Sequence, residues 1–154
     1  MKKLGVIGGL GPMATALFMQ MVTEMTEAEV DQEHIEMLIH SCPQIPDRTS
    51  FILDHTKEDP KPEMIRIGRN LVMQGAELIA IPCITANYFY SELEAGICMP
   101  IINAIEETHT YLTARKIHSV GLMATSGTIE SGLFQNMFAS SECTLVLPSR
   151  ERQQ

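Results

Sequence analysis

Short apolar runs alternate with longer amphipathic stretches along the whole chain, and this alternation limits the folds open to it. The runs of strand length occupy residues 4–8, 35–40, 77–82, 118–124 and 143–147, with a shorter one near 100–102. Because strands that alternate with helices favour parallel pairing, the sequence predicts an α/β fold with doubly wound parallel sheets. In such sheets, ligands bind at the carboxyl ends of the strands.

The stretches between the strands carry apolar residues at helical spacing. They predict helices at about residues 12–29, 62–74, 85–95, 104–115 and 127–139. Pro12 suits the first position of a helix, and Gly75 suits the position just past the end of one. Residues 41–60 are polar and interrupted by prolines, which predicts a loop without a helix.

Two parts of the chain share a pattern at a shift of 116 residues. Residues 4–7 then align with 120–123, Gly11 with Gly127, and 17–18 with 133–134. The shared pattern suggests a duplicated unit, with a first α/β lobe at residues 1–116 and a partial second lobe at 117–154. The counterpart of the run at 77–82 would lie near position ~199, so the second lobe is expected to be incomplete. The alternative is that any two strand–turn–helix units share glycines and apolar residues.

Composition and charge exclude several classes of partner. The net charge is −8 and the eleven lysines and arginines are scattered, so neither nucleic acid nor an anionic membrane is an expected partner. No apolar run reaches the roughly 18 residues of a membrane span, and a cytoplasmic location is expected. Four widely spaced cysteines indicate free thiols, and neither these nor the five histidines have metal-ligand spacing. We therefore expect no metal.

Cys83 is the strongest candidate for chemistry because it directly follows the strand predicted at 77–82. A thiol at a strand's carboxyl end and near a helix N-terminus meets unpaired N–H groups that favour the thiolate. Thr85 and Asn87 add polar side chains that can hydrogen-bond the sulfur or a ligand. The alternative is a buried structural cysteine with Thr85 as a helix cap.

Three further segments offer groups suited to an anion. The glycine-rich turn at residues 8–14 matches G-x-G-x-x-A, a loose dinucleotide pattern, but no acidic residue directly follows the second strand. Such a turn equally suits a ligand carboxylate. Arg48 follows the second strand, and its planar guanidinium suits a carboxylate, unless it is a solvated surface residue. The turn 125–128 offers hydroxyls and amides, or plain helix capping.

Four segments in order resemble one known family. Residues 5–15 (GVIGGLGPMAT), 46–49 (PDRT), 82–86 (PCITA) and 124–128 (ATSGT) together are similar to the cofactor-independent aspartate/glutamate racemases. The resemblance covers nearly all of the chain. It implies two similar α/β lobes with the active site between them.

The resemblance also implies a mechanism and a set of residues. Family members racemise acidic amino acids without pyridoxal phosphate or metal, using one cysteine from each lobe. Cys83 would be the first-lobe acid/base, and Arg48 would bind a substrate carboxylate. The other substrate-binding residues implied are Gly11, Met13, Thr85, Asn87, Thr125, Ser126 and Thr128.

This chain departs from the family pattern in two ways. The family usually has histidine at the position of Asn87, and asparagine cannot titrate near neutral pH. The second-lobe cysteine is absent from the sequence, so weak or no racemisation by this chain alone is expected. Two other interpretations remain open, a non-catalytic dicarboxylate-binding or dimerising domain and an NAD-binding fragment. Unpaired strand edges in the second lobe favour a homodimer.

Overall fold

The computed structural model describes residues 2–149 and residue 153. Contacts between residues divide the chain into two compact units. Unit 1 comprises Met1–Pro46, Asp59–Cys83 and Phe89–Ile102, and unit 2 comprises Asp47–Glu58, Ile84–Tyr88 and Asn103–Gln154. The two units are interleaved in sequence, whereas the lobes predicted at 1–116 and 117–154 are consecutive. The division of the chain into these two lobes stays a prediction.

Unit 1 is built on a three-stranded parallel sheet. Its strands are β1 (Leu4–Gly8), β2 (Met37–Ser41) and β3 (Leu78–Ala80), in the order β2-β1-β3. The pairing runs in register from Leu4 opposite Met37 on one side and Leu78 on the other. Beyond β3, the strand predicted near 100–102 is a single parallel bridge between Ile79 and Ile101. The parallel α/β class predicted from the sequence is confirmed.

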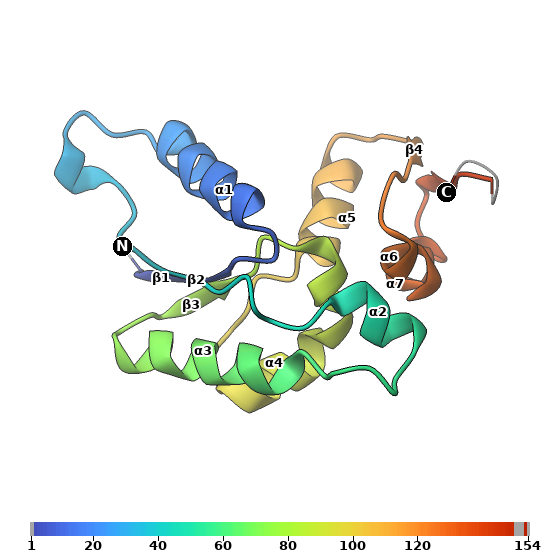
Figure 1. Ribbon diagram of the computed structural model, residues 1–154. Coiled ribbons are helices and arrows are strands. Elements are labelled where there is room, and N and C mark those ends of the chain that lie inside the picture. Colours follow the sequence, from blue (N-terminus) through green and yellow to red (C-terminus); the bar gives the residue numbers. More distant parts are fainter. Residues whose placement is uncertain (1, 150–152, 154) are drawn as a thin grey trace. The chain divides into compact units, whose positions relative to one another are not determined.

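Helices cover both faces of this sheet, as Figure 1 shows for α1 on one side and α3 and α4 on the other. Helix α1 (Pro12–Met25) contributes Phe18 to an apolar cluster with Val6 and Ala80. On the opposite face, α3 (Lys61–Met73) lies so close that a Cβ at Gly5 would approach Leu71 Cβ to 3.3 Å. Helix α4 (Tyr90–Ile97) packs on α3. The doubly wound arrangement is therefore present in unit 1.

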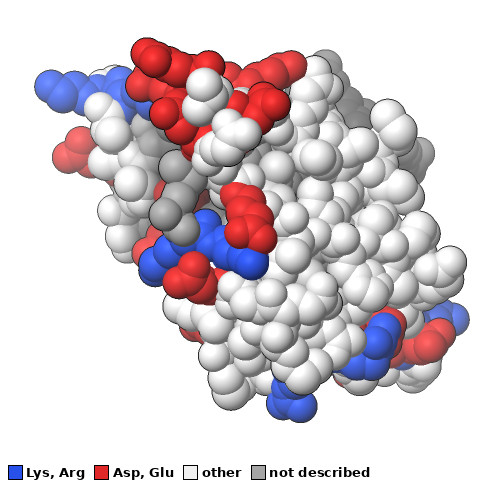
Figure 2. All heavy atoms as spheres, turned by 90° about the vertical axis from the view of Figure 1, so that its left-hand side faces the viewer, with Lys and Arg blue, Asp and Glu red and all other residues white. Residues whose placement is uncertain are grey.

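The segment after α1 is polar and exposed. Helix α1 ends at Met25, four residues earlier than predicted, and a short 3-10 helix, η1, follows at Asp31–Glu33. Its exposed acidic residues are Glu27, Glu29, Asp31, Glu33 and Glu36, and Glu24 adds another in the last turn of α1. Figure 2 shows acidic side chains gathered at the top of this face of the molecule. These like charges remain in water, where their mutual repulsion is screened.

The prediction of a loop without a helix at residues 41–60 is wrong. Helix α2 (Arg48–Leu53) lies within it. The Asp47 carboxylate begins this helix by accepting the Ser50 N–H at 2.6 Å, and Phe51 provides the buried contact. An aspartate cap and one apolar anchor are enough for a helix of this length, although the prolines before it and its own polar residues are also typical of a loop.

Unit 2 contains a smaller parallel sheet. Strands β4 (Ser119–Gly121) and β5 (Thr144–Val146) pair in parallel, and α5 (Ala104–Ala114) precedes them. The buried members of its core are Ile105, Leu112, Phe134, Phe138 and Cys143. The helix predicted at 127–139 is divided into α6 (Ser126–Glu130) and α7 (Leu133–Phe138). The break falls at Gly132, whose φ of +68° suits glycine.

Two other elements differ from the predictions. The helix predicted at 85–95 is a 3-10 helix, η2 (Ile84–Phe89), followed by α4. The duplicated pattern reappears as strand, turn and helix in both units. However, the helix caps are Gly11 and Thr125, which are 114 positions apart instead of 116. Duplication therefore stays a prediction.

Among the described residues, no helix is both long and apolar enough to cross a membrane.

The glycine-rich turn after β1 provides a test of the packing in unit 1. Gly9 has a φ of +91°, and a Cβ there would lie 2.5 Å from the Cys42 backbone nitrogen. We expect Gly9→Ala to destabilise the protein by about 3 kcal/mol, because both the left-handed conformation and the backbone contact oppose a side chain.

Gly11 in the same turn is the matched control, because a Cβ there meets nothing within 4 Å. Gly11→Ala should cost less than about 1 kcal/mol, the loss expected for alanine at a helix cap. Urea denaturation followed by circular dichroism measures both variants. Equal losses would contradict the packing described for Gly9.

Candidate functional site

The carboxyl edge of the unit 1 sheet gathers three chain segments. The turn at residues 9–11 follows β1, Cys42 follows β2, and Cys83 lies three residues after β3. The turn is held by the Gly9 N–H, which donates to Thr15 Oγ1 at 2.9 Å in a buried position. Because all three strands are parallel, their carboxyl ends meet at one edge, where an α/β sheet binds ligands.

Cys83 is half-buried and is not enclosed in the apolar core. Its N–H donates to the Ile81 carbonyl at 2.7 Å, which turns the chain sharply out of β3. The 3-10 helix η2 begins at the next residue. The sequence correctly predicted a strand before Cys83 and a helical segment after it, but this segment begins as a 3-10 helix instead of an α-helix.

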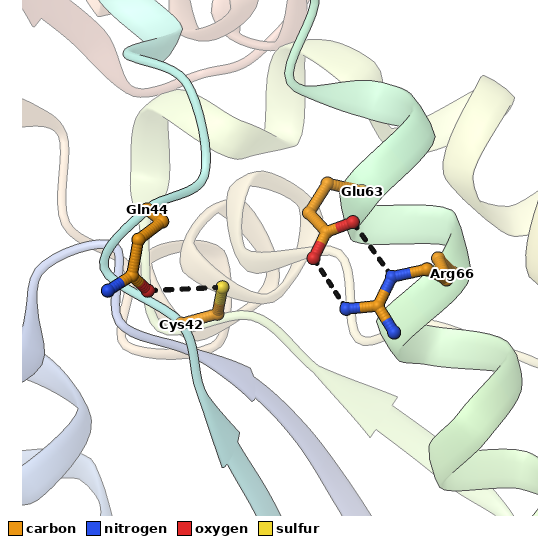
Figure 3. Close-up of polar contacts among 4 residues, drawn as sticks. All are labelled: Cys42, Gln44, Glu63 and Arg66. Atoms are coloured by element: carbon orange, nitrogen blue, oxygen red, sulfur yellow. Dashed lines mark hydrogen bonds and ion pairs between the residues drawn. The ribbon is translucent and has the colours of Figure 1, made fainter.

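Cys42 has a polar environment that the sequence analysis did not anticipate. Figure 3 shows its sulfur between Gln44 and the side chains of α3. The thiol donates to Gln44 Oε1 at 3.6 Å. Nearby, Arg66 Nε donates to Glu63 Oε2 at 2.8 Å, and this hydrogen bond lowers the pKa of Glu63 and raises that of Arg66. Only the fold reveals this cluster, because α3 is remote from β2 in sequence.

Unit 2 contains a cluster of three threonine hydroxyls, which we call the hydroxyl cluster. Thr85 Oγ1 lies 2.9 Å from Oγ1 of both Thr125 and Thr128. The hydroxyls of Thr125 and Thr128 lie 3.1 Å apart, and Thr125 Oγ1 also accepts the Thr128 N–H at 3.3 Å. Thr85 is therefore in direct contact with two other predicted residues that lie at least 40 positions away in sequence, within one unit.

The hydroxyl cluster can donate to an anion at a small cost. Each hydroxyl has a single proton, and in a closed set of three each one donates to a neighbour. Thr85 and Thr128 are buried, whereas Thr125 is exposed. A carboxylate that approaches Thr125 can accept its proton, while the buried pair keeps a hydrogen bond. Ser126 begins α6 beside this threonine.

Arg48 lies on a helix that packs closely against α6, the helix that carries Thr128 of the hydroxyl cluster. It is the first residue of α2 and is half-buried. Helices α2 and α6 are in tight contact, since a Cβ at Gly127 would lie 2.9 Å from Thr49 Cα. The Ser50 N–H that caps α2 lowers the pKa of Asp47, and the Arg48 charge adds to this effect. Arg48 and two residues of the hydroxyl cluster, Thr125 and Thr128, therefore lie on or next to two helices in contact, α2 and α6.

Asn87 uses its side chain to hold the backbone. Its Oδ1 accepts the Ala104 N–H at 3.0 Å, and its Nδ2 donates to the Ile84 carbonyl at 3.3 Å. The residue is 8% exposed. These bonds connect the η2 turn, which carries Thr85, to the first residue of α5. A buried amide with both functions bonded fixes the turn in place.

The predicted site residues thus divide between the units. Unit 1 holds Gly11, Met13 and Cys83, and the Met13 side chain is 80% exposed. Unit 2 holds the remainder, namely Arg48, Thr85, Asn87, Thr125, Ser126 and Thr128. Within the described part of the chain, no group of three or more histidine, cysteine or acidic residues is arranged to hold a metal ion.

Comparison with known proteins identifies relatives along nearly the whole chain. Residues 7–154 match the family model described as Asp/Glu/Hydantoin racemase. The broad specificity amino-acid racemase RacX of Bacillus subtilis is 28% identical over 138 residues, which cover 87% of this chain and 59% of that protein.

Solved structures share the fold. The aspartate racemase of Picrophilus torridus superposes with a TM-score of 0.88 at 28% identity, covering 98% of this chain and 64% of that one. An aspartate racemase homologue from Pyrococcus horikoshii gives a TM-score of 0.80 at 23% identity, covering 99% and 67%, and shows the fold alone. The chain therefore spans about three-fifths of the length of the first relatives it matches.

The cap of α2 generates a prediction about pH. Asp47→Ala should cost about 1 kcal/mol, while Asp47→Asn should cost only a few tenths because asparagine caps equally well. The folded pKa of Asp47 lies below its ordinary value of 3.8. Its charge therefore stabilises the protein above pH 3.8, and this contribution is lost as the pH falls through the lower folded value.

Unfolding free energies of the wild type and Asp47→Asn, measured between pH 2 and pH 7, isolate this effect. We expect their difference to shrink only in the acid range. A difference that stays constant with pH would contradict the assigned cap.

The hydroxyl cluster generates a second prediction. Thr85→Val keeps the shape of the side chain but removes the hydroxyl shared by Thr125 and Thr128, so it should cost about 1–2 kcal/mol. Thr85→Ser keeps the hydroxyl and should retain most of the stability that valine loses. Thermal unfolding of the two variants measures this order, and the reverse order would show that the methyl group, not the hydroxyl, matters at this position.

Proposed function

The chain belongs to the Asp/Glu/Hydantoin racemase family, and we propose that it carries one half of the proton-transfer machinery of an amino-acid racemase. In this proposal the substrate is an acidic amino acid such as aspartate or glutamate. Cys83 exchanges the α-proton on one face of the substrate, with neither pyridoxal phosphate nor a metal ion taking part. Relatives named as aspartate racemase and broad specificity amino-acid racemase support this assignment.

The observation that carries the proposal is the position of Cys83. Its partly accessible thiol follows β3 at the ligand-binding edge of a parallel sheet, inside the segment that matches the family. To invert a stereocentre, a base must remove the α-proton from one face while an acid delivers a proton to the other. A thiolate on one face and a thiol on the other meet this requirement, and they exchange roles in the reverse direction.

We propose that the hydroxyl cluster and Arg48 bind the substrate's carboxylates. The exposed Thr125 hydroxyl and the N–H groups of the first turn of α6 suit a carboxylate without adding charge. The Arg48 guanidinium suits a second carboxylate through paired hydrogen bonds. A dicarboxylate would use both groups, which is why an acidic amino acid fits this proposal better than a neutral one.

The thiol for the opposite face is not supplied by the cysteines of unit 2 or of α4. Cys143 is 3% exposed and precedes β5, so it lies in the core at the amino end of a strand. Cys98 is exposed at the end of α4, away from any strand's carboxyl end. Cys42 follows β2 in unit 1, the unit that also holds Cys83, so it is not the second-lobe thiol of the family pattern. We therefore expect this chain alone to exchange the α-proton from one side and to invert the substrate slowly or not at all.

Hydrogen exchange in deuterated water tests this proposal. The chain is incubated with L- or D-aspartate, and α-deuterium incorporation and inversion are measured separately by NMR and chiral chromatography. We expect incorporation into one enantiomer without inversion, and its loss in Cys83→Ala. Cys98→Ala is the matched control and should exchange like the wild type. Full-rate inversion, or exchange that persists in Cys83→Ala, would contradict the proposal.

A second candidate function is a non-catalytic dicarboxylate-binding or dimerising domain. It is favoured by the location of Arg48 and the hydroxyl cluster in one compact unit that does not contain Cys83. In that case aspartate binding, measured calorimetrically, should survive Cys83→Ala and fail in Arg48→Ala. Sedimentation of the same samples tests the homodimer that we propose for this chain.

A further inference from the structure

We propose that a cavity at the amino ends of β4 and β5 binds a phosphoryl oxyanion, as free phosphate or as the phosphate group of a small metabolite. The cavity has a volume of about 360 Å³. Its polar lining includes His109, Lys116, His118, Ser140, Ser141 and Glu142. A volume of this size accommodates a small molecule.

The cavity is separate from the proposed substrate groups in the same unit. His118 immediately precedes β4 and Cys143 immediately precedes β5, so the cavity lies at the amino edge of this sheet. The turn with Thr125 follows β4 at its carboxyl edge. Because substrates of α/β enzymes bind at the carboxyl edge, a ligand in this cavity would act as an effector or a structural anion.

The donors of the cavity match a phosphoryl group better than a carboxylate. Lys116 provides an ammonium group, two histidines provide ring nitrogens, and two serines provide hydroxyls. A phosphoryl group presents three strong acceptor oxygens, and lysine is a common phosphate ligand. In the described part of the chain, Lys116 forms no ion pair, and Glu142 is the only acidic residue lining the cavity.

Part of this lining is fixed before any ligand arrives. His109 Nε2 lies 3.0 Å from Ser141 Oγ, which also accepts the Cys143 N–H at 3.1 Å. The imidazole stands edge-on to the buried ring of Phe138, with 5.1 Å between the centroids. A donor held by two contacts loses little conformational entropy on binding. Among the described residues, those of this cavity included, no group of three or more histidine, cysteine or acidic side chains could hold a metal ion.

Lys116 occupies a backbone conformation that opposes its side chain. Its φ is +55°, in the left-handed region where glycine usually ends a helix, and its N–H donates to the Thr113 carbonyl at 3.0 Å. Glycine at this position would relieve the conformational cost. A lysine at this position is explained if its ammonium group binds an anion in the cavity.

This conflict provides a test in which loss of binding cannot be attributed to unfolding. Inorganic phosphate is titrated into the wild-type chain, and the imidazole resonances of His109 and His118 are followed by NMR. Saturable shifts are expected. Lys116→Gly should raise the thermal midpoint by roughly 2–4 °C without phosphate and weaken phosphate binding about tenfold. Glu142→Gln should tighten binding by removing the opposing charge.

Lys57→Ala is the matched control, because it removes one exposed lysine of the same unit far from these residues in sequence. It should leave phosphate binding unchanged. A titration with glycerol phosphate distinguishes the two sources of the phosphoryl group. If glycerol phosphate binds more tightly than inorganic phosphate, the ligand is an organic phosphate; if it binds more weakly, the ligand is the free ion. Absence of saturable shifts, equal losses in Lys116→Gly and Lys57→Ala, or tighter binding of L-aspartate than phosphate at these histidines would overturn the proposal.

Discussion

The parallel pairing of β1 with a strand on each side is the constraint on which the rest of unit 1 depends. It sends the chain out of all three strands at one edge, so the glycine-rich turn, Cys42 and Cys83 meet there. The turn can lie against the end of β2 only because Gly9 has no side chain to displace the Cys42 backbone. A thiol placed after β3 is consequently at the ligand-binding edge, whatever its sequence neighbours are.

Much of this arrangement could be predicted from residue patterns. The apolar run at residues 4–8 and the glycine-rich turn indicated a buried strand before a helix, and the structure confirms both. Helix α2 was missed because an aspartate cap beside proline and polar residues also fits a loop. The division of the last helix at Gly132 was also missed, since an isolated glycine in an apolar periodic stretch does not by itself indicate a break.

The candidate residues show a similar limit. Its position after a predicted strand made Cys83 a candidate, and its role stays a prediction. No sequence pattern indicated that Thr85 would share hydrogen bonds with Thr125 and Thr128. Those contacts depend on the packing of segments about forty residues apart. Asn87 illustrates the opposite case, because a residue that the sequence assigned to a ligand uses both ends of its amide to hold the backbone. The chemical type of a side chain alone cannot distinguish a residue that holds the backbone from one that is free to bind a ligand.

We propose that Cys83 lies where an acidic amino acid binds. The most direct test is the rate of alkylation of each cysteine by iodoacetamide, measured by peptide mass spectrometry with and without L-aspartate. We expect aspartate to slow the alkylation of Cys83 and to leave that of exposed Cys98 unchanged. Alkylation of Cys83 that is indifferent to saturating aspartate, or protection of both cysteines to the same extent, would contradict it.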